Sequence, residues 1–220
     1  MERVLLPSSS PIVSFRIVFT AGASLDPQGK LGVARLTAAM IAEGGTRTRT
    51  YEEIVRAMYP MATNFFSQVD KEMSVFGGQT HIDNLQAYYR LIVEMLTDPG
   101  WREDDFKRLK EDAINFLKIN LRENNDEELG KELLYNFIYS GTSYGHANAG
   151  TITSLEQLTL ADVREFYLRH YNQSNLVLGL SGGYSEEFSA SVQAEFAAKL
   201  PTGAKTESGI PEPAPISGLE

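Results

Sequence analysis

The side chains that most often bind catalytic metals or move protons are few in this sequence and widely spaced. Its histidines are His81, His146 and His170, and none has a second histidine three to five residues away. Two histidines one turn apart on a helix are a common way to hold zinc, so these three give no helical metal site. We expect each of them to have a structural or surface role.

The signatures of other common chemistries are also missing from the 220 residues. There is no cysteine, no Gly-x-Ser-x-Gly motif and no Gly-x-x-x-x-Gly-Lys-Ser/Thr phosphate loop. Carboxylates are abundant, but clusters such as Glu103-Asp104-Asp105 and Glu127-Glu128 fall at predicted helix starts, where we expect them to be solvated. A net charge of −9 without a basic stripe argues against a nucleic-acid partner.

The elements that would position a site do not alternate regularly between strand and helix. β-Branched and aromatic residues predict strands at 11–20, 63–69, 72–80 and 175–181, with a hairpin turn at Asp70-Lys71. This order favours an α+β fold, with an antiparallel or mixed sheet packed by helices, over a doubly wound sheet. No apolar run reaches the roughly 18 residues of a membrane span, so no membrane insertion is expected.

Apolar residues at helical spacing predict helices at 31–42, 50–59, 82–96, 104–122, 126–139, 159–170 and 185–200. In the 126–139 helix, the stripe expected to face the core consists of Leu129, Leu133, Leu134 and Phe137. Residues 1–200 are expected to form a single domain. The prolines at 201, 211, 213 and 215 predict that residues 201–220 are a linker or tail, and we expect the chain to come from a longer protein.

A series of short motifs carries a resemblance to a known family. The motifs are Gly22-Ala23-Ser24, Gly32-Val33-Ala34, Met40 to Thr46, Tyr144-Gly145-His146, Gly150-Thr151 and Asn175 to Leu178. In their order and spacing, over about residues 10–200, the chain resembles the N-terminal lobe of the pitrilysin/insulinase-type zinc peptidases. These are the inverzincins, which include the processing-peptidase type. The resemblance implies a LuxS/processing-peptidase-like metallohydrolase lobe.

The same resemblance locates a zinc motif that this chain does not have. The family pattern continues Gly-x-Ala-His-x-x-Glu-His-Met, and here its two histidines and its glutamate base correspond to Arg35, Ala39 and Ala38. The third family ligand is a glutamate on a later helix, in the region of Leu117 and Lys118, where this chain has no carboxylate. We therefore expect no cofactor in this chain and no catalysis by it alone, with positive charge from Arg35 and Lys118 opposing a metal ion.

The resemblance also implies a role for such a lobe. Family members close two similar lobes around an unfolded peptide, and sister lobes without zinc help to shape the chamber. We expect this chain to pair with a zinc-bearing lobe or subunit and to bind substrate peptide along a strand edge at Phe65, Phe66, Ser67, Gln68 and Val69. Two alternatives stay open: a purely structural assembly subunit, like the core proteins of respiratory complexes, and a hydrolase with an unconventional site.

Overall fold

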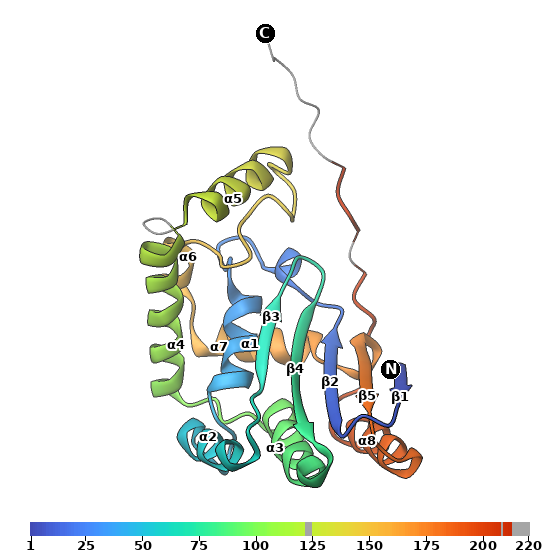
Figure 1. Ribbon diagram of the computed structural model, residues 1–220. Coiled ribbons are helices and arrows are strands. Elements are labelled where there is room, and N and C mark those ends of the chain that lie inside the picture. Colours follow the sequence, from blue (N-terminus) through green and yellow to red (C-terminus); the bar gives the residue numbers. More distant parts are fainter. Residues whose placement is uncertain (122–124, 208, 213–220) are drawn as a thin grey trace.

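A five-stranded mixed sheet organises the chain (Figure 1). The computed structural model describes residues 1–121, 125–207 and 209–212. The strand order is β1-β5-β2-β4-β3, in which β1 pairs parallel to β5 and the other neighbours are antiparallel. The strands are β1 Glu2–Pro7, β2 Ile12–Phe19, β3 Phe66–Val69, β4 Ser74–His81 and β5 Leu176–Gly182.

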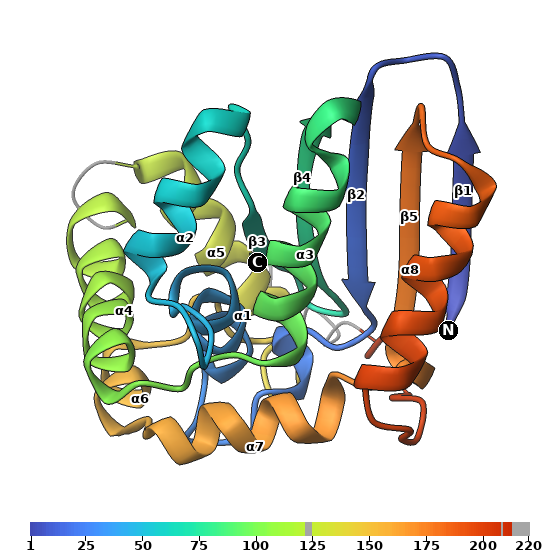
Figure 2. The same cartoon turned by 90° about the horizontal axis from the view of Figure 1, so that it is seen from below.

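One face of the sheet carries the core. Alternate residues of β2 point to this face, and Phe15, Ile17 and Phe19 are fully buried there. The ring of Phe15 contacts Tyr88 of α3 and Phe188 of α8, so these two helices lie side by side on this face (Figure 2). The opposite face has no such helical cover on β1, whose Val4 and Leu6 side chains are exposed.

The remaining helices stand beyond β3 and around the end of the sheet (Figures 1 and 2). α4 continues directly into a π-helical segment, Phe116–Leu121. None of the described helices is both long enough and apolar enough to cross a membrane. The helices are α1 Val33–Glu43, α2 Tyr51–Met58, α3 Leu85–Thr97, α4 Glu103–Asn115, α5 Asp126–Ile138, α6 Ile152–Gln157, α7 Leu160–His170 and α8 Glu186–Lys199.

The α+β prediction is confirmed, and so are most of the predicted elements, but several details differ. β1 was not predicted, because its six residues pair only with β5, more than 170 positions away in the chain. β3 begins at Phe66 rather than at residue 63. The short helix α6 was also missed, although Thr151 forms a capping box with Ser154 at its start. The predicted end of the 104–122 helix lies outside the described residues.

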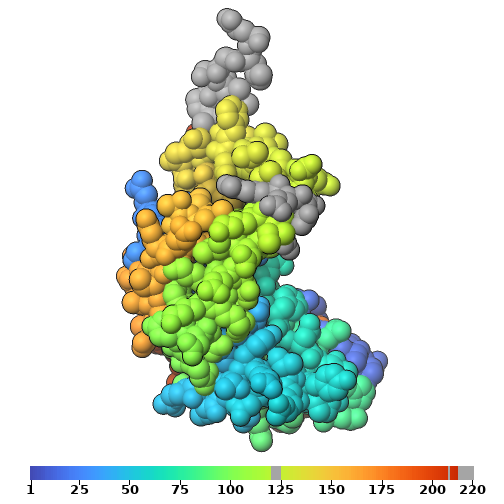
Figure 3. Space-filling model, turned by 90° about the vertical axis from the view of Figure 1, so that its left-hand side faces the viewer, coloured from blue at the N-terminus to red at the C-terminus, as the bar shows by residue number. Residues whose placement is uncertain are grey.

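The prediction for α5 is wrong in one respect that matters. The helix forms, but Leu133, Leu134 and Phe137 are 60%, 57% and 69% exposed, and no residue of α5 is buried. The helix lies at one end of the molecule, beyond α4, so the sheet cannot cover it (Figures 1 and 3). Helical periodicity correctly gave an apolar stripe but not a partner for it inside the domain.

The described part of the tail follows the surface without helix or strand. Thr206 N donates to Asn175 Oδ1 at 2.7 Å, and Ser174 Oγ donates to the carbonyl of Gly203 at 2.6 Å. Residues 201–207 are therefore held against the loop that precedes β5. Pro213 and Pro215 lie outside the described residues.

Candidate functional site

A buried carboxylate fixes the start of helix α1. Gly32, the N-cap residue, has a φ of 94° and provides no side-chain acceptor for the free N–H groups of the first turn. Asp26 supplies it, because its fully buried carboxylate accepts from Gly32 N at 2.6 Å and from Ala34 N at 2.9 Å. His146 Nε2 lies 3.5 Å from the same carboxylate. The first turn of α1, and with it Arg35, is therefore held in place.

One face of α1 lines a cavity of about 400 Å³. Arg35 and Ala39 both line it, while Ala38 is 1% exposed and belongs to the hydrophobic core. In the family pattern these three residues stand for the first histidine, the second histidine and the glutamate. The structure therefore brings the two positions that the resemblance assigns to the histidines to the cavity, and it packs the position assigned to the glutamate into the core.

The segment expected to carry the third ligand contributes an aromatic ring. Phe116 lines the cavity, and the guanidinium carbon of Arg35 lies 4.5 Å from the centre of its ring. This is a close cation–π contact. Leu117 is buried in the core. Lys118 is exposed and is not part of the cavity lining, which corrects the expectation that it adds charge at the site.

The cavity lining does not suit a zinc ion. Its charged side chains are Arg35, Glu43 and Asp112, and a guanidinium has no lone pair to offer a metal. Zinc in catalytic sites needs three protein donors arranged around one point. Across residues 1–121, 125–207 and 209–212, no three His, Asp or Glu side chains are grouped so that they could hold a metal ion. The charged residues of the cavity lining therefore do not form a set of zinc ligands.

Strand β3 forms the wall of the cavity opposite α1. Ser67, Gln68 and Val69 line it, and β3 is an edge strand, since it pairs only with β4. The side chain of Phe65 is instead in the core, stacked on Phe76. Phe66 lies under the guanidinium of Arg16, which is 5.3 Å from its ring centre. Of the five residues expected to bind peptide, three therefore line the cavity.

The register of β3 against β4 determines which backbone N–H and C=O groups of β3 point away from β4. Asp70 N donates to the carbonyl of Met73 at 2.9 Å, at the turn that joins β3 to β4. In an antiparallel pair, alternate residues direct both backbone groups to the same neighbour. Gln68 therefore also bonds to β4, and the N–H and C=O groups of Ser67 and Val69 point to the free edge. Within the described part of the chain these four groups have no hydrogen-bond partner in a neighbouring strand.

Acidic side chains occupy the other end of the cavity. Glu43 is on the last turn of α1, and Asp112 is on α4. Arg108 lies between them, donating to the carbonyl of Glu43 at 2.6 Å and reaching within 4.0 Å of Asp112. Arg108 also forms an ion pair of 3.1 Å with Asp105.

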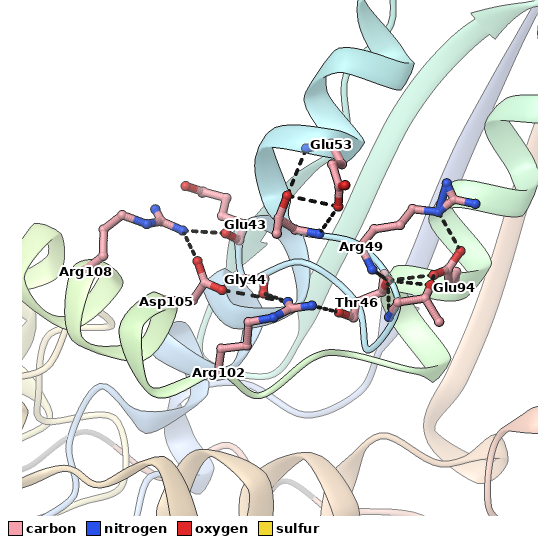
Figure 4. A network of polar contacts seen from close by, with 11 residues as sticks. Glu43, Gly44, Thr46, Arg49, Glu53, Glu94, Arg102, Asp105 and Arg108 are labelled. Atoms are coloured by element: carbon pink, nitrogen blue, oxygen red, sulfur yellow. Dashed lines mark hydrogen bonds and ion pairs between the residues drawn. The ribbon is translucent and has the colours of Figure 1, made fainter.

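A network of polar contacts holds this end of α1 against α3 and α4 (Figure 4). Arg102 donates to the carbonyl of Thr46 at 2.6 Å, and Thr46 Oγ1 donates to Glu94 at 2.6 Å. Arg49 pairs with the other carboxylate oxygen of Glu94 at 3.3 Å. The loop after α1 is therefore fixed to α3 and to the start of α4, while helix α1 itself sets the distance between Glu43 and Arg35.

Burial shifts the pKa values of the charged residues at the two ends of the cavity, Arg35 and Glu43. It lowers the pKa of the Arg35 guanidinium from its ordinary value, against the attraction of Glu132 on α5. It raises the pKa of the Glu43 carboxyl, against the attraction of Arg108, and the neighbouring Asp112 raises it further. Both shifts mean that the charged forms are incompletely solvated and gain from an opposite charge.

Three residues that shape this cavity were missed from the sequence. Asp26 was not singled out, although an aspartate shortly before a helix without a capping side chain is a signal for its N-terminus. Glu43 follows Arg35 and Ala39 at intervals of four residues, which places the three along one face of a helix. Phe116 had no signal, because its contact with Arg35 depends on how α4 packs against α1.

Comparison with known proteins identifies the family. The sequence profile of the insulinase family, peptidase family M16, matches residues 3–152, more than half of the chain. An uncharacterized zinc protease of Rickettsia bellii is 22% identical over 175 residues, which cover 80% of this chain and 42% of that protein. The chain spans less than half the length of this curated relative.

Two solved structures share the fold. The inactive domain of a peptidase M16 protein from Pseudomonas fluorescens is 26% identical, with a TM-score of 0.86 over 96% of this chain and 51% of that one. A chain of complex III2 from Candida albicans is 17% identical, with a TM-score of 0.74 over 96% of this chain and 47% of that one. From the matched profile and the shared fold, the chain belongs to the insulinase family of peptidases, family M16.

Proposed function

We propose that this chain is a non-catalytic lobe of an insulinase-family peptidase, and that it holds an extended peptide against β3 in a chamber completed by a zinc-bearing partner lobe. The observation that carries the proposal is the composition of one cavity. It combines a free strand edge, Ser67 to Val69, with a guanidinium and an aromatic ring where the family has metal ligands.

The free edge supports peptide binding. The outward backbone groups of Ser67 and Val69 can pair with two residues of an added strand, whatever its sequence. Exposed strand edges are usually protected by charge, bulges or cover, because they otherwise recruit other chains. Here the edge lines a cavity of about 400 Å³.

The donor set supports the absence of catalysis by this lobe. Arg35 and Ala39 offer no metal ligand, and Ala38 is buried and has no carboxylate to accept a proton. Any zinc that serves this chamber would have to come from the partner lobe.

Two observations support a partner. The chain corresponds to 51% of the length of the inactive domain from Pseudomonas fluorescens and 42% of the Rickettsia relative, so these proteins have room for a second unit of similar size. In addition, α5 exposes Leu133, Leu134 and Phe137, a group of apolar side chains without cover in the described structure. Exposed apolar patches of this kind are typical of docking surfaces.

Reconstitution tests the proposal. The partner to be used is an insulinase-family protein of the same organism that carries His-x-x-Glu-His, purified alone and together with this chain. We expect the two to co-purify and only the mixture to cleave a fluorogenic peptide. A mixture whose partner has Gln in place of the motif glutamate serves as the inactive control. Cleavage by the partner alone at the full rate of the mixture would contradict the proposal.

A variant of the strand edge tests the peptide contact in this chain itself. Ser67→Pro removes an N–H that points away from β4, and proline is tolerated on edge strands. We expect it to lose binding of an extended peptide while the thermal midpoint stays close to that of the parent. Ser67→Thr keeps the N–H and is the matched control, so equal loss in both variants would argue against pairing at this edge.

The likeness to a chain of complex III2 supports a second candidate, a purely structural assembly subunit. Such a subunit would dock to its partner through α5 and would not bind a peptide at β3. Crosslinking distinguishes the two: a photoreactive peptide that labels β3 in the assembled complex supports the first proposal, and the absence of labelling supports the second.

A further inference from the structure

The cavity beside β3 has opposite charges at its two ends, and this polarity points to a peptide class. We propose that the groove selects an extended peptide segment with an acidic side chain and, four residues later, a basic side chain. The acidic residue would pair with Arg35 and the basic residue with Glu43. This inference rests on the proposed function and names the substrate class for the same site.

The spacing of the two charges fits an extended chain. Arg35 and Glu43 are eight residues apart on α1, which corresponds to about 12 Å along the helix axis. In a β-strand, residues i and i+4 lie on the same face about 13 Å apart. A strand that runs beside α1 can therefore present one side chain to each charge. Residue i+2 would meet the apolar floor between them, which includes Ala39, Leu109 and Ala113.

The direction of β3 sets the order of the charges. Ala42 near the end of α1 and Phe65 just before β3 line one small pocket. At the other end, Lys71 donates to the carbonyl of His146, which also neighbours Asp26 before α1. β3 therefore runs antiparallel to α1 (Figure 1). A strand added antiparallel to β3, the more stable pairing, runs in the direction of α1 and meets Arg35 first.

Arg35 lacks the partner that a half-buried guanidinium normally has. It stacks on Phe116, and within the described residues no carboxylate lies within ion-pair distance of it, although Glu132 on α5 attracts it from farther away. A guanidinium presents donors in a planar fork that matches a carboxylate. A peptide carboxylate at this place would form charge-assisted hydrogen bonds away from bulk water, where they are stronger than on the surface.

At the other end of the cavity, Glu43 offers a negative charge, opposite to that of Arg35. Its carboxylate forms no ion pair within the described residues, because Arg108 bonds to its backbone carbonyl and to Asp105. Asp112 adds a second negative charge nearby. A lysine or arginine side chain entering here would meet the carboxylates of Glu43 and Asp112, beside the guanidinium of Arg108.

Blocked peptides of eight residues test the selectivity on the intact 220-residue chain. The parent peptide consists of serine and threonine, with glutamate at the third position and lysine at the seventh. The comparison peptides have glutamine at both positions, or the two charged residues exchanged. Binding is measured by fluorescence anisotropy with a dye on a terminal linker. We expect the parent to bind about tenfold more tightly than either, the effect of roughly one charge-assisted contact.

Reversing the charge of Arg35 gives a test that partial unfolding of the variant cannot mimic, because one peptide should then bind more tightly. Arg35→Glu should weaken the parent peptide and strengthen a peptide with lysine at the third position, whereas Arg35→Gln should remove the preference at that position. Lys118→Glu, an exposed change of the same sign outside the cavity lining, is the matched control and should leave the preference unchanged.

The outcomes separate this inference from the proposal on which it rests. If all peptides bind with equal affinity and Ser67→Pro abolishes the binding, peptide addition stands and the charge selectivity is wrong. If none of the peptides binds at millimolar concentration, the proposed peptide-binding function itself fails. A preference for the exchanged peptide would overturn the inferred order of charges.

Discussion

Helices α1 and α5 carry similar apolar stripes and have opposite environments. Eight of the eleven residues of α1 are buried, between β3, α4 and α7, and its remaining face lines the groove. α5 has thirteen residues and none is buried. The stabilisation of α1 comes from inside the lobe, whereas α5 has an apolar surface that no other described segment of the chain buries. We infer that α1 serves the fold and the groove, and α5 serves assembly.

The largest expected loss of stability comes from truncating a core side chain of α1. Ile41 is fully buried, so Ile41→Ala should lower the free energy of unfolding by about 2–5 kcal/mol through lost burial and a new cavity. Urea denaturation followed by circular dichroism measures it. A loss below about 1 kcal/mol would contradict the buried position of α1, because such a loss is typical of an average substitution and too small for a buried isoleucine.

The next largest effect on stability is expected from the residues that cap the N-termini of α1 and α5. Asp26→Asn keeps the shape of the cap of α1 but removes its charge, and should cost about 1–2 kcal/mol. Asn125 caps α5 by accepting from Glu128 N at 3.1 Å, and is exposed. We expect Asn125→Ala to change global stability much less, since α5 can fray without disturbing the core. Equal losses in the two variants would mean that α5 is part of the cooperative unit.

A pH experiment sharpens the account of the loop after α1. Burial acts to raise the pKa of Glu94, but the hydroxyls of Thr46 and Thr48 and the charge of Arg49 outweigh it and lower the pKa below its ordinary value of 4.5. A carboxyl with a lowered folded-state pKa stabilises the fold above its unfolded pKa. That contribution disappears as the pH falls through the folded value. Stability should therefore decline below about pH 4.5 less steeply in Glu94→Gln than in the parent.

The smallest effect on stability is expected on α5. Leu134 is 57% exposed, so Leu134→Ala should change the free energy of unfolding by about 0.5 kcal/mol or less. The same variant should weaken association with the zinc-bearing partner in analytical ultracentrifugation. Unchanged association would remove α5 from the docking surface.

Much of the fold follows from local signals in the sequence. The capping box at Thr50 and Glu53 and the alternation in β2 specify their elements, and both are present in the structure. The resemblance to the family also singles out Arg35 and Ala39, because the family pattern fixes their register, and both residues line the cavity. β1 and the contact of Phe116 with Arg35 could not be predicted, since both depend on packing between distant segments. The exposure of α5 could not be predicted either, because periodicity does not say which molecule covers a stripe.

Backbone hydrogen exchange of β3 tests most directly whether this lobe holds a peptide. The chain is incubated in deuterated buffer with and without the glutamate–lysine peptide at saturation, and individual amides are followed by NMR. The account predicts that the amides of Ser67 and Val69 become protected. Those of Gln68, already bonded to β4, and of Asp70, already bonded to Met73, should change little. Unchanged exchange at Ser67 and Val69 with the peptide bound would contradict it.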